Sequence, residues 1–512
     1  MEVGVYHGGQ PGAAEIHGFQ KPRPPRPHDL NPFRVGPLLS HPPCYDWDPM
    51  KNIVHLDYQA ILANSAQPVH LAFQFTAPAV GGHRERPAAF SLVLDRSGSM
   101  QGEPLAAALR AAKVVVQNLR REDWFALVTF DDTAQLVIPM GPVTAKQSAY
   151  DRIEAIQSGG STNLTGGWML GRDALRATPT GTVRRQLLLT DGQLNVGITE
   201  PPRVRQIVTD GLERDSIRTS TLGFGDSYEE DLLSDLAKAT GGSFYDANQA
   251  DKLPEIFRAE LDGLQQTAVQ NLRLRFKTLD FVEAMKSLGG YCEVKLADGR
   301  TEFAVGDLVA DEERVAVFAL AVLPIPLLAG TTTPAASLDG EALVEVEIAY
   351  DEITQAGVTS HTERHTIRVR PAQSPADIQV NEEALPWVSA QQAAEILGQA
   401  LTKRDGGDVV GARRLLEAGI ARLKAYARDA QIADGLKLLE SALTQLADGE
   451  NYVRSRKSLR YMQGSYSKMS SAEAWVNETG IPSFKKPRTQ PQPPQTPPAS
   501  EPTPPAEPPA QS

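Results

Sequence analysis

The sequence predicts an α/β protein built on a doubly wound, mostly parallel sheet, which is inserted in or followed by a β-sandwich and a small helical domain. Three observations support this fold class. Short apolar runs alternate with longer helical stretches between residues 88 and 263, as in parallel sheets buried on both faces. Strand-like segments lie on both sides of this region. Amphipathic helical segments follow toward the carboxyl end.

The amino-terminal part divides into an arm and a strand-rich segment. Residues 1–50 are rich in Pro, Gly and His and show no periodicity, so we expect an extended arm without a core of its own. Residues 51–80 contain two strand-like stretches, IVHLDYQAIL at 53–62 and VHLAFQFTAP at 69–78. Their β-branched and aromatic residues predict a hairpin or a sheet edge.

Residues 88–263 contain the elements of the parallel sheet. The first buried strand is AAFSLVLD, and it is followed by a helix over PLAAALRAAKVVVQNL. Further strands are predicted at DWFALVTF, RQLLLTD and IRTSTLGFG, and EEDLLSDLAKATGG is predicted to be a helix that ends on a glycine cap. Sheets of this kind bind ligands at the carboxyl ends of their strands, so functional side chains are expected there.

A second run of strand-like segments occupies residues 266–371, with the spacing of a β-sandwich. Because strand-rich sequence lies on both sides of the α/β region, we expect residues 51–80 to join this sandwich. The α/β region would then be an insertion in it.

The carboxyl-terminal part is predicted to be helical and then disordered. A capping box formed by Ser389 and Gln392 predicts the start of a helical domain over residues 386–450. Further helices are expected near residues 409–426 and 430–447. Residues 481–512 are so rich in proline that they cannot bury apolar surface, and we expect a disordered tail.

Composition excludes several classes of function. The formal net charge of −12 argues against general binding of nucleic acid or of anionic membrane surfaces. The first 25 residues lack the apolar run of a secretion signal, and no stretch reaches about 18 unbroken apolar residues, so we expect a cytoplasmic protein without membrane insertion. Cys44 and Cys292 lie far apart and have no CxxC partner, which argues against a disulfide framework or a zinc site. Frequent Ala, Arg and Gly suggest a bacterial source.

Candidate metal ligands follow the ends of two predicted strands and occupy one loop between them. Asp95, Ser97 and Ser99 form the pattern DxSxS directly after the first strand. Thr162 lies in the glycine-rich segment SGGSTNLTGG, and Asp191 ends a later apolar strand. Hard oxygen ligands of this kind suit Mg²⁺, with Mn²⁺ next and Ca²⁺ as a further alternative. We therefore predict that these five residues bind one divalent cation.

Two sets of neighbouring residues are expected to shape these loops. The glycines around Thr162 let the backbone turn tightly beside the predicted cation, and they are Gly159, Gly160, Gly166 and Gly167. The side chains of Asn163 and Asn195 are neutral, and we expect them to hold the loops in place.

These motifs resemble the metal-ion-dependent adhesion site of von Willebrand factor A (VWA) domains, and the resemblance covers residues 88–263. The segment TLGFGDSYEEDLLSDLAKATGGSFYDANQADKLPEIF is similar to bacterial members, and the β-rich flanks are similar to the inter-alpha-inhibitor-like branch. The resemblance implies that Ser97 and Ser99 coordinate directly and that Thr162 coordinates directly or through water. Asp95 and Asp191 would often act through water, which leaves one position free for a carboxylate of a partner.

The function expected from this resemblance is metal-dependent binding of a protein partner that supplies a Glu or Asp to the cation, without catalysis. One alternative is an accessory subunit of a MoxR-like or chelatase-like AAA+ ATPase. A metal-dependent hydrolase is disfavoured because the loops offer mainly Ser, Thr, Asn and Asp, without an evident base or nucleophile. A further alternative is an intact site that only stabilises its own loops.

The segment at residues 451–480 is basic and aromatic within an acidic protein, above all in NYVRSRKSLRYMQGSYSK at 451–468. Such a segment can contact RNA or an acidic protein. Packing against a neighbouring domain, or a solvated face, is the interpretation that we favour.

Overall fold

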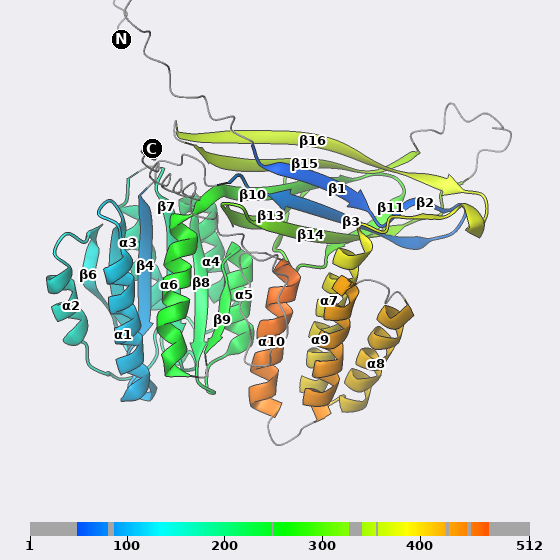
Figure 1. Ribbon diagram of the computed structural model, residues 1–512. Coiled ribbons are helices and arrows are strands. Elements are labelled where there is room, and N and C mark those ends of the chain that lie inside the picture. Colours follow the sequence, from blue (N-terminus) through cyan, green and yellow to red (C-terminus); the bar gives the residue numbers. More distant parts are fainter. Residues whose placement is uncertain are drawn as a thin grey trace, which may run out of the picture. The chain divides into compact units, whose positions relative to one another are not determined.

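The computed structural model describes residues 49–79, 87–179, 181–247, 249–326, 340–354, 357–425, 430–447 and 452–469. The predicted arm before residue 49, the end of the basic segment after residue 469 and the proline-rich tail lie outside these described residues. Within them, the chain forms an α/β unit, a pair of packed sheets and a helical unit (Figure 1). The predicted fold class is confirmed.

The α/β unit contains a six-stranded sheet in the order β6-β5-β4-β7-β8-β9. Pairing is parallel throughout except between β5 and β6. All residues of β4 and β8 are buried, as the unbroken apolar runs predicted. The strands are β4 (Ala88–Asp95), β5 (Trp124–Phe130), β6 (Ala134–Pro142), β7 (Val183–Thr190), β8 (Ile217–Phe224) and β9 (Phe244–Ala247).

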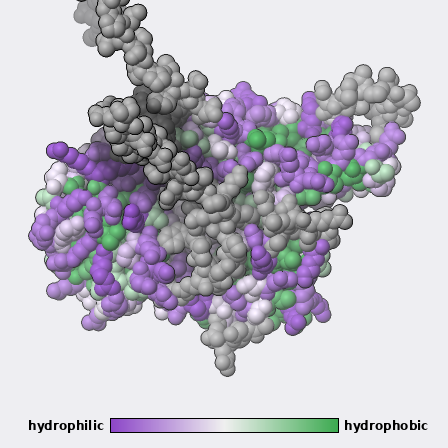
Figure 2. All heavy atoms as spheres, viewed as in Figure 1, coloured by the Kyte–Doolittle hydropathy of each residue, from purple (hydrophilic) through white to green (hydrophobic). Residues whose placement is uncertain are grey.

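Helices cover both faces of this sheet (Figure 1). Apolar side chains of α1, α2 and α6 pack on one face, and those of α3, α4 and α5 pack on the other. On the side drawn in Figure 2, hydrophilic side chains cover most of the region around α1 and α2, as expected for helices with one apolar side. The helices are α1 (Glu103–Asn118), α2 (Lys146–Glu154), α3 (Leu164–Arg176), α4 (Pro201–Asp215), α5 (Glu230–Thr240) and α6 (Leu253–Gln265). Gly241 caps α5 in the left-handed conformation, as predicted.

Two antiparallel-rich sheets form the sandwich around a cluster of phenylalanines, in which the Phe276 and Phe318 rings lie 4.8 Å apart. One sheet has the order β1-β3-β14-β11 and the other β12-β13-β10-β15-β16-β2-β17. The strands are β1 (Lys51–Leu56), β2 (Tyr58–Leu62), β3 (Gln67–Thr76), β10 (Thr267–Thr278), β11 (Val282–Ser287), β12 (Glu293–Lys295), β13 (Thr301–Val309), β14 (Glu313–Val322), β15 (Glu341–Thr354), β16 (Gly357–Ala372) and β17 (Gln379–Val380).

The α/β unit is an insertion in this sandwich, as predicted. β3 pairs with β14, and β2 pairs with β16, so strands from before and after the α/β unit share both sheets. The amino edge of the six-stranded sheet is the edge that meets the sandwich. Arg218, at the start of β8, forms a buried ion pair with Asp307 of β13, and β10 begins at Thr267 just after α6 ends at Gln265.

The prediction of one strand over residues 53–62 was wrong in one respect. The chain changes sheets at Asp57, so that β1 forms an edge of one sheet while β2 belongs to the other. The Asp57 carboxylate accepts hydrogen bonds from the His70 backbone N–H at 2.7 Å and from His70 Nδ1 at 2.6 Å. These bonds hold the crossing point, because they satisfy a buried carboxylate beside an extended strand.

The helical unit consists of α7 (Leu385–Asp405), α8 (Val409–Ala425), α9 (Ala430–Ala447) and α10 (Tyr452–Lys468), which lie side by side in Figure 1. The predicted helix start at Ser389 was wrong. α7 begins at Leu385, and Ser389 is buried inside it. Pro386 occupies the first turn, where a missing N–H is tolerated, so the helix can begin there. Ser389 then lies in the helix interior, where it cannot act as a cap. None of the helices in the described ranges is long and apolar enough to span a bilayer.

Candidate metal centre

Asp95 is the last residue of β4, and its carboxylate is fully buried. The first carboxylate oxygen, Oδ1, accepts a 2.8 Å hydrogen bond from the Ser97 backbone N–H. The second oxygen, Oδ2, accepts a 2.6 Å hydrogen bond from the Thr190 hydroxyl at the end of β7. Both oxygens are therefore held in place by neighbours at the carboxyl edge of the sheet.

Two serine hydroxyls connect this loop to Asp191. Ser99 Oγ donates a 2.7 Å hydrogen bond to Asp191 Oδ1, and Ser97 Oγ lies 3.1 Å from Ser99 Oγ. Because a hydroxyl has one proton to donate, Ser97 is the donor in its contact with Ser99. The chain of hydrogen bonds places four of the five predicted ligands next to one another.

Thr162, the fifth predicted ligand, comes from the loop before α3 and is buried. Its hydroxyl and that of Ser99 both approach Gly192, where a Cβ atom would lie 3.5 Å from Thr162 Oγ1 and 3.6 Å from Ser99 Oγ. The structure thus brings all five residues together at one point. In the described part of the chain, no cluster of three or more His, Cys, Asp and Glu side chains could hold a metal, so a cation here would rely on hydroxyls as well as on two carboxylates.

The glycines before Thr162 are needed for close approach to two aspartates. A Cβ atom on Gly159 would lie 2.0 Å from Asp131 Oδ2, and one on Gly160 would lie 2.1 Å from Asp132 Oδ2. Neither glycine has a positive φ angle, so the requirement is steric. Asp131 in turn pairs with Arg96 at 2.7 Å, which ties the two loops together. Sequence reasoning missed Asp131, although it follows β5 at the edge where ligands were expected.

The two asparagines act as loop holders, as expected. Asn195 Oδ1 accepts a 2.7 Å hydrogen bond from the Thr162 backbone N–H. Asn163 Oδ1 accepts a 2.9 Å hydrogen bond from Gly166 N–H and so caps α3. Thr190, which orients Asp95, was not singled out from the sequence because it looks like one more residue of an apolar strand.

The electrostatics of the site favour a bound cation. Burial raises the pKa of Asp95 to about 6, and the charge of Asp191 adds to the rise, against the hydrogen bonds from Thr190 and Ser97. Burial also raises the pKa of Asp191, against its hydrogen bond from Ser99. Two neighbouring carboxylates whose charged forms are both penalised by burial are stabilised by a positive ion between them. Hard oxygen donors and this charge balance fit a divalent cation.

An open groove of about 520 Å³ leads away from these hydroxyls. Its lining includes Ser99 and Thr162, the β8–α5 loop at Asp226 and Tyr228, and the first turn of α10 at Val453. A ligand can therefore approach the predicted metal ligands from solvent along a surface built by five segments that are distant in sequence.

The α/β unit that carries this site matches a known family of domains. Residues 91–259 match the von Willebrand factor type A domain family. The match begins within β4 and ends within α6, so it includes all five predicted ligands. The chain contains a VWA domain, as the motifs implied.

The sequence similarity to known proteins extends beyond this domain. The uncharacterized protein sll0103 of Synechocystis sp. is 27% identical over 381 residues, which cover 72% of this chain and 85% of that protein. The uncharacterized protein YfbK of Escherichia coli is 27% identical over 188 residues, covering 36% and 32%. Human inter-alpha-trypsin inhibitor heavy chain H4 is 27% identical over 221 residues, covering 38% of this chain and 24% of that protein. The bacterial and inter-alpha-inhibitor-like resemblance is confirmed, although the chain spans only a minor part of the last two proteins.

Solved structures share the fold over most of the chain. A von Willebrand factor type A protein from Catenulispora acidiphila has a TM-score of 0.63 at 16% identity and covers 82% of this chain and 97% of its own. The ArnB paralog VWA2 from Sulfolobus acidocaldarius has a TM-score of 0.57 at 15% identity and covers 82% and 98%. At such identities the likeness shows the fold alone. That coverage exceeds the VWA domain, so the likeness includes much of the remaining chain.

Proposed function

We propose that Asp95, Ser97, Ser99, Thr162 and Asp191 bind a divalent cation, Mg²⁺ by preference, and that the cation captures a carboxylate of a partner protein. The observation that supports this function is the convergence of three hydroxyls and two carboxylates beside an open groove that Ser99 and Thr162 line. A divalent cation held there can take a carboxylate oxygen as a further ligand.

The residues of the chain have distinct tasks in this proposal. Ser97, Ser99 and Thr162 offer neutral hydroxyls, so only Asp95 and Asp191 contribute negative charge before an incoming carboxylate is bound. Thr190 fixes the rotation of the Asp95 carboxylate, and Asn195 fixes the backbone of the Thr162 loop. Such outer contacts orient ligands and raise the affinity for a metal.

Binding is favoured over hydrolysis by the groups that line the groove. Around Ser99 and Thr162 the groove offers hydroxyl and amide side chains, including Gln193 and Asn195. The Glu230 carboxylate, further along, is paired with Lys457 at 2.8 Å and with Arg456, so its charge is already matched. A general base beside the metal site, which hydrolysis needs, is not supplied by these groups, and the exposed carboxylate of the groove, Asp226, lies in the β8–α5 loop 3.6 Å from Arg454.

The first test is the cation itself. Isothermal titration with Mg²⁺ and Mn²⁺ is expected to give one binding event with the wild-type protein and none with the double variant Ser97→Ala and Ser99→Ala. Ser227→Ala, which changes a hydroxyl in the same groove outside the predicted ligand set, is expected to bind like wild type. Equal binding by the double variant and the wild type would overturn the metal site.

The second test is the partner. Wild-type protein and Asp95→Ala are each immobilised, exposed to lysate of the source organism in Mg²⁺ or in chelator, and analysed by mass spectrometry. We expect a protein that is retained only by wild type in Mg²⁺. Identical retained proteins in all four conditions would contradict a receptor role for the metal site.

A further inference from the structure

The carboxyl-terminal helix α10 is docked on the VWA domain beside the metal-ligand residues. The Lys457 ammonium is buried, and it donates hydrogen bonds to the Tyr228 carbonyl at 2.7 Å and to Glu230 Oε2 at 2.8 Å. It also lies 3.7 Å above the centre of the Tyr228 ring, within range of a cation–π contact. Tyr228 belongs to the β8–α5 loop, so α10 is fixed to a loop that borders the groove.

Further ion pairs fix the orientation of α10. Arg454 donates two hydrogen bonds to Asp246, at 3.0 and 2.7 Å, and Arg460 pairs with Asp231 at 2.7 Å. Arg456 pairs with Glu230, with Asp231 at 2.5 Å and with Asp405 of α7 at 2.7 Å. The positive charges of the basic segment are therefore paired within the molecule, with acidic residues of the VWA domain and of α7.

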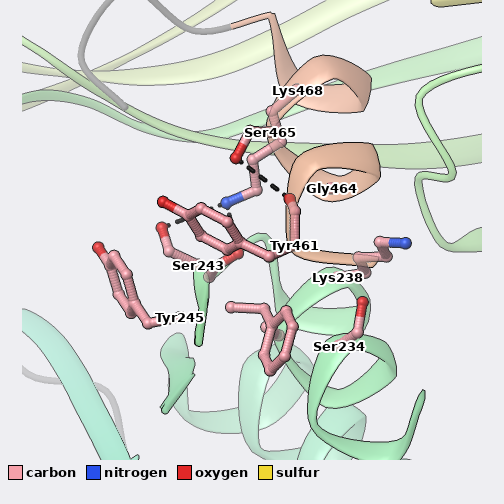
Figure 3. A pocket seen from close by; sticks show the side chains of 11 residues that line it. Ser234, Lys238, Ser243, Tyr245, Tyr461, Gly464, Ser465 and Lys468 are labelled. Carbon is pink, nitrogen blue, oxygen red and sulfur yellow. Dashed lines mark hydrogen bonds between the residues drawn. The ribbon is translucent and has the colours of Figure 1, made fainter. Parts of the chain in front are cut away.

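The far end of α10 is held in the same way. Figure 3 shows Lys468 pointing toward Ser243, and its ammonium donates hydrogen bonds to the Gly242 carbonyl at 2.6 Å and to Ser243 Oγ at 3.3 Å. Tyr461 and Ser465 of α10 line the same narrow contact with α5 and β9. Contacts along its length thus hold α10 in one position relative to the metal-ligand loops.

This position leaves an apolar side chain exposed on the groove. Val453, the second residue of α10, is 62% exposed and lines the groove together with Ser99 and Thr162. The Asp226 side chain, 70% exposed, lies on the same groove and is 3.6 Å from Arg454. The groove therefore combines the metal-ligand hydroxyls, an exposed apolar group and an exposed carboxylate.

We propose that this composite groove is the partner-binding surface and that it accepts a protein segment with an apolar residue beside its acidic residue. The inference rests on the proposed function, because the acidic residue is the one that the cation captures. Covering Val453 with an apolar side chain removes both from water, which favours binding. The exposed carboxylate of Asp226 repels a second acidic residue and favours a basic one, which limits the acceptable segments by charge complementarity.

The chain offers a closely matched control for Val453. Val410 is 61% exposed and is the second residue of α8, as Val453 is the second residue of α10. Val410 does not line the groove. Val453→Ser and Val410→Ser therefore make the same chemical change at the same place in a helix, on and off the proposed surface.

The probe is an array of blocked hexapeptides that carry one glutamate each, with every amino acid in turn at the neighbouring positions. Full-length wild type, Val453→Ser, Val410→Ser and Asp95→Ala are applied in Mg²⁺ and in chelator. We expect wild type and Val410→Ser to prefer peptides with an apolar residue next to glutamate, in Mg²⁺ only. Val453→Ser should lose this preference and bind the preferred peptides about fivefold more weakly. Asp95→Ala should bind none.

The outcomes separate the two proposals. An unchanged preference in Val453→Ser, with binding still lost in Asp95→Ala, overturns the composite groove and leaves the metal site intact. Equal binding in Mg²⁺ and in chelator by all four proteins, or no binding by wild type, overturns both.

Discussion

Thr190 donates a 2.6 Å hydrogen bond to Asp95, so the final residue of β7 sets the orientation of the carboxylate that ends β4. Both residues are buried, and the acceptor is the second carboxylate oxygen, which the Ser97 N–H does not reach. Thr190, which was not among the predicted ligands, thus controls the position of the Asp95 carboxylate, which was.

Replacing Thr190 by valine keeps the shape of the side chain and removes this donor. We expect the affinity for Mg²⁺ to fall about tenfold, as is common when an outer contact of a metal ligand is lost. The pKa of Asp95 should rise further, because a hydrogen bond that favours its charged form is gone. Calorimetric titration measures the affinity, and Thr190→Ser, which restores a hydroxyl, should recover it. Unchanged affinity in the valine variant would exclude the orienting role.

Substitutions of Gly192 test whether the cation occupies the space between the hydroxyls of Ser99 and Thr162. A single Cβ atom would make ordinary contacts at 3.5 and 3.6 Å with Thr162 Oγ1 and Ser99 Oγ, so Gly192→Ala should bind Mg²⁺ within about threefold of wild type. The branched side chain of Gly192→Val should crowd the hydroxyls and weaken binding more than tenfold. Circular dichroism of both variants checks that the fold is kept. Tight binding by the valine variant would place the cation elsewhere.

Removing the buried ammonium of Lys457 should loosen α10. We expect Lys457→Met to lower the free energy of unfolding by about 2–3 kcal/mol, because a buried, paired charge is lost. Urea denaturation gives this number, and faster amide hydrogen exchange in α10 would show where the loss acts. The exposed pair of Lys424 and Glu440, 3.1 Å apart, provides the control. Lys424→Met should cost less than about 1 kcal/mol, and equal costs for the two lysines would contradict the docking role.

Lys238 on α5 should make stability depend on pH. Burial lowers its pKa to about 8, and the nearby charges of Arg460 and Lys468 contribute to the decrease. The charged lysine therefore destabilises the folded state at every pH below about 8. This cost disappears as the pH rises through the unfolded-state pKa of about 10.4.

Lys238→Met should accordingly stabilise the protein at pH 7, by about 1–3 kcal/mol. The gain should shrink between pH 8 and pH 10.5, where wild-type Lys238 loses its proton. Urea denaturation of both proteins at pH 7 and at pH 10.5 checks this. A constant difference between the two pH values would refute the depressed pKa.

The sequence was sufficient where a feature depends on neighbouring residues. The buried strands β4 and β8 were predicted because a parallel strand covered on both faces must be apolar throughout. Asp95 and Asp191 could be placed at one edge because both follow apolar strands of the same sheet. The glycine cap of α5 was equally local.

Features that depend on distant partners could not be predicted in this way. The change of sheets at Asp57 depends on His70 and on two separate pairing partners. The docking of α10 depends on charges more than two hundred residues away in sequence, such as the pair of Lys457 and Glu230. The sequence therefore favoured packing against a neighbouring domain or a solvated face for the basic segment, but it did not indicate which acidic residues the segment contacts. Val453 acquires its place in the groove only through that docking.

The insertion of the VWA domain has a mechanical consequence. The chain enters the domain before Ala88 and leaves it after Gln265, and both residues contact Asp123, while Arg218 of β8 is paired with Asp307 beside these junctions, all at the amino edge of the sheet. The loops that carry the predicted metal ligands occupy the opposite edge. A partner that pulls on those loops would therefore load two covalent connections in parallel, with an ion pair beside them. A domain mounted in this way resists rotation about either connection, and cutting one of them does not release it.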